Sequence, residues 1–340
     1  MAIPFGHGWD RAREEIYVPR DRTGPSVPSA PDADTDRTGH GLWDQDAARD
    51  VLRQQVVEHL ASPMGVLVVV EAEFVKATGS CVGTYRHTDG LLGRPEHRQR
   101  GVFLGYASPK GEGYLDRELF LPRSWTERQS LRVACGLPSD VTFATCSQMA
   151  RRMLSRALHA GVPHSAVAGG PDIGADAGLR MWLEDLGETY VLGVPGRETV
   201  RVGKTALRAD AITSIWPDEA WHPPQDRQGA DRGELMGAIQ LEPAPSMDWR
   251  RWLIAVRYSW DRESTQYFMA HVPAGTEMEE MYRILKAYRQ ISLSIPEARR
   301  TVGLDRFSGK SWEAWYRHMT VALMAYTMRN MLHKGETPAC

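Results

Sequence analysis

Cysteine is scarce in this sequence of 340 residues, and the four that occur have no metal-type spacing: Cys81, Cys135, Cys146 and Cys340. Such a scatter favours reduced thiols over a disulfide framework or a structural zinc site. Long apolar runs are also missing, since none approaches the roughly 18 residues that a membrane-spanning helix needs. The opening residues form too short an apolar stretch for a signal peptide. We therefore expect a cytoplasmic protein with no membrane partner, no structural metal and no cofactor.

Excess charge of either sign is lacking as well. The chain has 41 basic and 43 acidic residues, which gives a formal net charge of −2. A protein whose whole surface binds nucleic acid usually carries a strong positive excess, so this balance excludes that class while leaving room for a local basic groove. With 42% hydrophobic and 25% charged residues, the composition is that of an ordinary globular protein with one large core or two modest ones.

An apolar, β-branched run at residues 65–76 stands out against this background. Its length and composition predict a strand that is buried on both faces. Glu71 and Glu73 come at its end, two positions apart, so they share one face of the strand. Because α/β sheets keep their sites at the carboxyl ends of central strands, both glutamates are candidate site residues. The alternative interpretation is a solvated strand end.

The rest of the chain reads as a mixed α/β sheet. Residues 1–40 are rich in proline and charge, which predicts an extended or disordered leader. Residues 41–196 alternate between strand and helix patterns and predict the first part of a core, with a Gly- and Arg-rich connection at 84–100 and a hairpin turn at 108–113. Residues 197–272 predict a β-rich insertion before the last core helix, and residues 273–335 predict closing helices, the first of them interrupted or ended by Pro296.

Several uncommon strings point to a family. They lie at residues 101–109, 115–126, 143–145, 152–154, 157–163 and 311–323. In this order and spacing they resemble the DDE transposases of bacterial insertion sequences, particularly those abundant in actinobacteria. The resemblance covers about residues 43–330. It implies an RNase H-like core in which two aspartates and a glutamate hold two divalent metals for the cleavage and joining of DNA strands.

The same resemblance implies where those acids should stand. It places Val70 and Gly170 at the positions of the two aspartates, Ser292 at the position of the glutamate, and Arg299 at the basic residue that follows. All three acids are thus replaced, and Pro296 would break the helix that should present the third. We expect that the metal site is gone and that these four residues now line an emptied cleft.

Three acids remain within one or two residues of the lost positions: Glu71, Glu73 and Asp172. They are the candidate catalytic residues of a site that works without metal. A displaced metal site is the competing hypothesis, but strand alternation turns Glu71 and Glu73 away from the face of Val70. Solvated charge is the third interpretation.

Three functions follow from the sequence. The favoured one is a domesticated transposase-fold protein that no longer transposes and has been recruited to catalysis on a small molecule, as in a biosynthetic pathway. The first alternative is a DNA-binding or regulatory protein that does not cleave and that holds nucleic acid through a basic loop containing Arg86, Arg94, Arg98 and Arg100. The second is a decayed transposase remnant.

Overall fold

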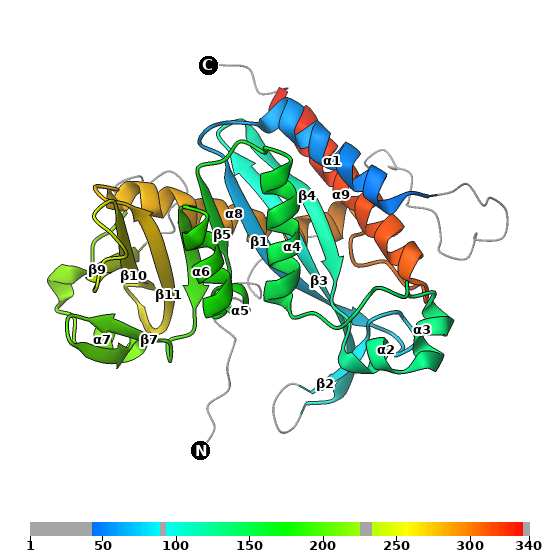
Figure 1. Cartoon of the computed structure of the whole chain (residues 1–340), viewed down its shortest axis with the longest axis horizontal. Helices are drawn as coiled ribbons and strands as arrows, with labels where there is room; N and C mark the ends of the chain where they lie inside the picture. The colour runs from blue at the N-terminus through cyan, green and yellow to red at the C-terminus, as the bar shows by residue number, and fades with distance from the viewer. Residues whose placement is uncertain (1–42, 89–92, 225–232, 336–340) are drawn as a thin grey trace.

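A computed structural model describes residues 43–88, 93–224 and 233–335 (Figure 1). The predicted leader at residues 1–40 lies outside them. The strands are β1 (Val66–Lys76), β2 (Tyr85–Thr88), β3 (Pro95–Ser108), β4 (Gly111–Leu119), β5 (Ala166–Gly169), β6 (Tyr190–Val194), β7 (Thr199–Val202), β8 (Thr205–Arg208), β9 (Glu234–Leu241), β10 (Trp249–Tyr258) and β11 (Asp261–Pro273). The helices are α1 (Gln45–Leu60), α2 (Arg123–Glu127), α3 (Gln129–Cys135), α4 (Cys146–His159), α5 (Pro171–Gly174), α6 (Ala177–Asp185), α7 (Ala209–Ser214), the short 3₁₀ turn η2 (Asp218–Ala220), α8 (Met278–Val302) and α9 (Trp312–Gly335).

A large mixed sheet flanked by helices forms the body of the molecule, which confirms the predicted α/β class. In the described residues its strand order is β2-β3-β1-β5-β6-β11-β10-β9, with β4 paired to β3. β1 lies near the middle, antiparallel to β3 and parallel to β5. Val69 is in register with Gly169, so the carboxyl edge of this parallel pair lies here, although β1 itself continues beside β3 to Lys76. This edge is where α/β proteins place their sites.

The residues of β1 explain why it is central. Val66, Val68 and Val70 face a core built with α8 and α9, whereas Leu67 and Val69 face a second core built with α4 and α6. All five are at most 4% exposed, as expected for a strand covered on both faces. Figure 1 shows α4 and α6 on the near side of the sheet and α8 behind it.

The segment before the hairpin contains more strand than the sequence predicted. The hairpin itself is confirmed, because β3 and β4 pair down to Ser108 opposite Gly111. The charged stretch at residues 84–100, which reads as a connection, instead supplies β2 and the first half of β3. Its exposed and charged side chains hide the strand pattern.

The expected end of α8 at Pro296 is wrong. The helix continues through this proline to Val302 and ends where Gly303 takes a left-handed conformation at φ 68°. Proline lacks the N–H that would bond to the carbonyl of Ser292, but one lost hydrogen bond in a helix packed on β1, β3 and β5 does not stop it. The helix that should present the third acid position is therefore intact.

The β-rich stretch at residues 197–272 continues the main sheet. β11 pairs antiparallel with β6, and β10 and β9 follow outward, so the sheet runs without a break into this region. β7 and β8 form a separate two-stranded ribbon. The boundaries assigned to the four segments of the chain stay a prediction.

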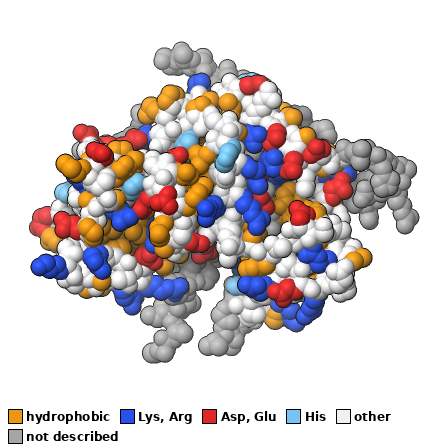
Figure 2. All heavy atoms as spheres, viewed as in Figure 1, with side chains coloured by type: hydrophobic (Ala, Val, Ile, Leu, Met, Phe, Trp, Pro, Cys, Tyr) orange, Lys and Arg blue, Asp and Glu red, His pale blue; other side chains and the backbone are white. Residues whose placement is uncertain are grey.

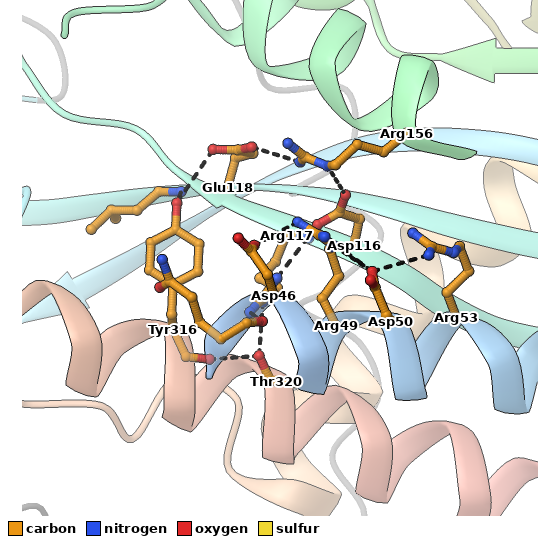
Figure 3. Close-up of polar contacts among 12 residues, drawn as sticks. Asp46, Arg49, Asp50, Arg53, Asp116, Arg117, Glu118, Arg156, Tyr316 and Thr320 are labelled. Atoms are coloured by element: carbon orange, nitrogen blue, oxygen red, sulfur yellow. Dashed lines mark hydrogen bonds and ion pairs between the residues drawn. The ribbon is translucent and has the colours of Figure 1, made fainter. Parts of the chain in front are cut away.

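A buried polar network joins β4 to three helices (Figure 3). The guanidinium of Arg117, 2% exposed, donates to Thr320 of α9 at 2.7 Å and to the carbonyl of Gln45 in α1 at 2.8 Å. Asp116 accepts from Arg156 of α4 at 2.8 Å. In Figure 2 basic and acidic side chains lie next to each other over this part of the surface.

None of the helices in the described residues has the length and apolar character needed to cross a membrane.

Candidate functional site

The three predicted acids meet around one guanidinium beyond the carboxyl end of β5, beside the second half of β1. Glu71 and Glu73 come from β1, and Asp172 lies in the short helix α5 that follows β5. Arg100 of β3 lies between them, with guanidinium nitrogens 2.5 Å from Glu73 Oε1, 3.5 Å from Glu71 Oε2 and 3.9 Å from Asp172 Oδ2. We call these four residues the acid–arginine cluster.

Strand register explains the position of Arg100. Glu73 of β1 is paired with Arg100 of β3, so the two side chains leave the sheet on the same face. Glu73 also accepts from the hydroxyl of Tyr85 at 2.5 Å and from Arg98 at 3.1 Å. Burial alone would raise the pKa of Glu73, but the hydrogen bonds from Tyr85 and Arg100, with the charge of Arg100, lower it to about 2. Glu73 is therefore a fixed anion that positions Arg100.

Glu71 behaves in the opposite way. Its side chain is 15% exposed, and within the described residues its buried Oε1 has no hydrogen-bond partner. Burial raises the pKa of Glu71 to about 7; Arg100 opposes this rise and the neighbouring charge of Asp172 adds to it. Near neutral pH this carboxyl is therefore about half protonated. The thiol of Cys146 stays protonated, because burial and the charge of Glu71 raise its pKa to about 12.

A tyrosine that the sequence did not single out lies beside Gly170, one of the positions of the predicted cleft. A β-carbon added at Gly170 would lie 2.8 Å from the hydroxyl oxygen of Tyr288. Ser292, one turn further along α8, donates to the Tyr288 carbonyl at 2.8 Å, and the Tyr288 ring packs against the core that includes Val70. Burial raises the pKa of Tyr288, and the charges of Glu71 and Asp172 add to the rise. This phenol therefore fills the space beside Gly170 and lies close enough to Glu71 and Asp172 to be affected by their charges.

Arg299 lies at the far end of the same helix. Its guanidinium donates to the main-chain carbonyl of Glu73 at 2.7 Å and stacks over the ring of Phe74 at 4.9 Å. It thus ties α8 to the end of β1. Among the arginines of the basic loop, Arg86 and Arg94 are exposed, whereas those at positions 98 and 100 are engaged by Glu73.

The residues at this edge do not fit the pair of divalent metals that the resemblance implies. Two-metal chemistry needs clustered carboxylates that are free to ligate, about 3.5–4 Å from one ion to the next. Here Glu73 is engaged by three donors, and the guanidinium of Arg100 lies among the three acids, where it would repel a divalent cation. Within the described residues no group of three or more His, Cys, Asp or Glu side chains is arranged to hold a metal ion.

Comparison with known families shows the superfamily to which the chain belongs. A family model described as DDE superfamily endonuclease matches residues 35–225, which is more than half of the chain. The chain belongs to this superfamily. The mixed sheet with flanking helices is consistent with the RNase H-like fold of a DDE protein. A search of curated proteins found no match. The match of this DDE-superfamily chain includes Val70, Gly170 and the acid–arginine cluster and ends before Ser292.

Proposed function

We propose that this DDE-superfamily chain is a domesticated transposase-fold protein that no longer cleaves DNA, and that its acid–arginine cluster carries out metal-independent proton transfer on a small organic molecule. One observation carries the proposal: the guanidinium of Arg100 lies among Glu71, Glu73 and Asp172, where it supplies a permanent positive charge. The loss of the family's three acids, as inferred from the sequence, supports the same conclusion.

The roles of the residues follow from their environments. Glu71 serves as the general acid or base, since a carboxyl with a pKa near 7 both gives and takes a proton at neutral pH. Arg100 stabilises negative charge that develops on the substrate. Asp172, with a side chain that is 70% exposed, faces solvent and meets the substrate first. Glu73 is a positioning residue that holds Arg100 in place.

DNA cleavage is the activity to exclude first. We expect supercoiled plasmid to remain intact in the presence of Mg²⁺ or Mn²⁺, and calorimetric titration with Mn²⁺ to show no tight site. Nicking that depends on Mn²⁺, disappears with EDTA and is lost in Glu71→Gln would overturn the proposal.

The positive test uses the purified full chain with a library of small metabolites, followed by mass spectrometry. We expect at least one compound to be converted by the wild-type protein and by Glu96→Gln but not by Glu71→Gln. Glu96 is the matched control because it is a glutamate that pairs with an arginine, Arg98, but is exposed at the protein surface outside the acid–arginine cluster. Conversion that is equal in all three proteins would remove Glu71 from the mechanism.

Nucleic-acid binding without cleavage is the alternative function, and exposed Arg86 and Arg94 favour it. It predicts duplex binding that weakens steeply with salt and that is reduced in the double variant Arg86→Ala, Arg94→Ala. A decayed remnant is the remaining alternative. A cooperative unfolding transition of the purified protein would argue against it, because decay strikes core positions as readily as catalytic ones.

A further inference from the structure

A separate cavity of 390 Å³ lies away from the acid–arginine cluster, between the outer strands β9 and β10 and the first turns of α8. The segment at residues 220–224 forms its outer wall. Two main-chain hydrogen bonds between His222 and Met236, of 2.9 and 2.8 Å, fasten this segment to β9. Its volume falls in the range of small-molecule sites, which is roughly 300–1,000 Å³.

The lining of this cavity is mostly apolar and aromatic. Met236 and Trp252 come from the two strands, and Met278 and Tyr282 come from the helix. The Tyr282 hydroxyl donates to the buried carboxylate of Glu234 at 2.9 Å, so its ring rather than its oxygen is offered to the cavity. Thioethers, an indole and a phenol ring together favour a flat aromatic occupant.

An acidic side chain lies at the rim. Glu279 lines the cavity, and in the described part of the chain its carboxylate makes no hydrogen bond or ion pair. Two cations lie nearby: Arg283 is engaged by Glu280 and Ser165, each at 2.7 Å, and the Lys286 ammonium lies over the Tyr282 ring, 5.6 Å from its centroid. Acidic residues in a first helical turn also stabilise the helix dipole, so the charge alone does not identify a site. Here, however, the unpartnered carboxylate borders an aromatic cavity.

We propose that this cavity binds a small aromatic amine. The ring lies against Trp252, Met236 and Met278, and the ammonium group pairs with Glu279 at the rim. The cavity shares no lining residue with the acid–arginine cluster. The inference therefore goes beyond the proposed proton-transfer function and stands or fails independently of it.

Three probes that share the indole ring system and differ in charge test the ligand class. They are tryptamine, tryptophol and indole-3-acetate, each titrated calorimetrically into the full chain. We expect tryptamine to bind most tightly, tryptophol less tightly, and indole-3-acetate least or not at all. Equal affinity for the three probes, a preference for the acid, or no binding of tryptamine up to millimolar concentration would overturn the proposal.

Two variants test whether tryptamine binds in this cavity. Ala238→Leu adds volume at the lining and should abolish tryptamine binding, whereas Glu279→Gln should weaken tryptamine by about twofold to fivefold and leave tryptophol unchanged. Glu313→Gln is the matched control, since Glu313 is an exposed acid in the first turn of α9. Thermal melting confirms that each variant is folded. Wild-type affinity in folded Ala238→Leu would show that the amine binds elsewhere.

Discussion

The hydroxyl oxygen of Tyr288 stands 2.8 Å from the point where a β-carbon on residue 170 would lie, and Gly170 leaves it that room. The backbone of Gly170 has an ordinary φ of −77°, so space rather than conformation requires glycine here. The position that the family resemblance assigns to an aspartate is thus closed by a side chain from α8. Restoring the acid requires this phenol to move.

Gly170→Asp should therefore lower the free energy of unfolding by roughly 1–3 kcal/mol, the usual cost of forcing extra atoms into a packed site. The cost should fall by more than half when Tyr288→Phe removes the opposing oxygen. Urea denaturation of the wild type, both single variants and the double variant measures this. An equal cost of Gly170→Asp in both backgrounds would show that Tyr288 does not close the position.

Glu71 should make stability depend on pH. The folded state keeps the proton on Glu71 up to about pH 7, whereas an unfolded chain releases it near 4.5. The folded state binds more protons between these values, so the contribution of Glu71 to the free energy of unfolding falls as the pH rises from about 4.5 to 7. Glu71→Gln resembles the protonated form and should be more stable than the wild type at pH 8, by on the order of 1–3 kcal/mol. Denaturation curves at pH 5 and pH 8 check this, and a difference that does not grow with pH would contradict it.

Glu73 should show the opposite sign. Its pKa is lowered to about 2, so its contribution to stability is present above pH 4.5 and is lost as the pH falls through 2. Glu73→Gln removes the negative charge and replaces one of the two acceptor oxygens shared by two arginines and a tyrosine with an NH2 donor, and it should cost about 1–3 kcal/mol at pH 7. The control Glu96→Gln removes an exposed ion pair and should cost less than about 0.5 kcal/mol. Equal costs for the two variants would remove Glu73 from the positioning role.

Arg117→Met tests the buried network beneath β4. It leaves Thr320 and the Gln45 carbonyl without their donor, and the loss of one partner of a buried charged pair costs about 3–5 kcal/mol. The control Arg123→Met affects an arginine that is 67% exposed and should change stability by less than about 0.5 kcal/mol. Thermal and urea unfolding would refute the prediction if both variants behaved alike.

The parts of the fold that could be predicted are those in which burial sets the pattern. The strand β1 and the helix α4 can be recognised from the sequence, because the spacing of the hydrophobic residues in each segment is typical of one type of secondary structure. β2 is exposed and charged, so no such pattern exists for it. The effect of Pro296 was mispredicted for a related reason. The packing of α8 on the sheet outweighs the local tendency of proline to end a helix, and this packing cannot be inferred from the sequence of α8 alone.

The site was predictable to a similar degree. The proximity of Glu71, Glu73 and Asp172 follows from the parallel pairing of β1 with β5, because the pairing ends at Val69 and Gly169 and the next residues of both segments start close together. Arg100 was expected in a basic loop and not among the acids, because its place depends on the register between β1 and β3, which are separated by a long connection and fix their alignment only when folded. Tyr288 lies one turn before Ser292, so helical spacing from that residue was a usable signal.

One helix, α8, contributes residues to both the aromatic cavity and the surroundings of the acid–arginine cluster. Tyr282 borders the aromatic cavity and Tyr288 borders the acid–arginine cluster, and six residues of α8 span only about 9 Å. The lining of the cavity and the side chain that closes position 170 are therefore held by the same element, and the placement of α8 on the sheet sets the geometry of both.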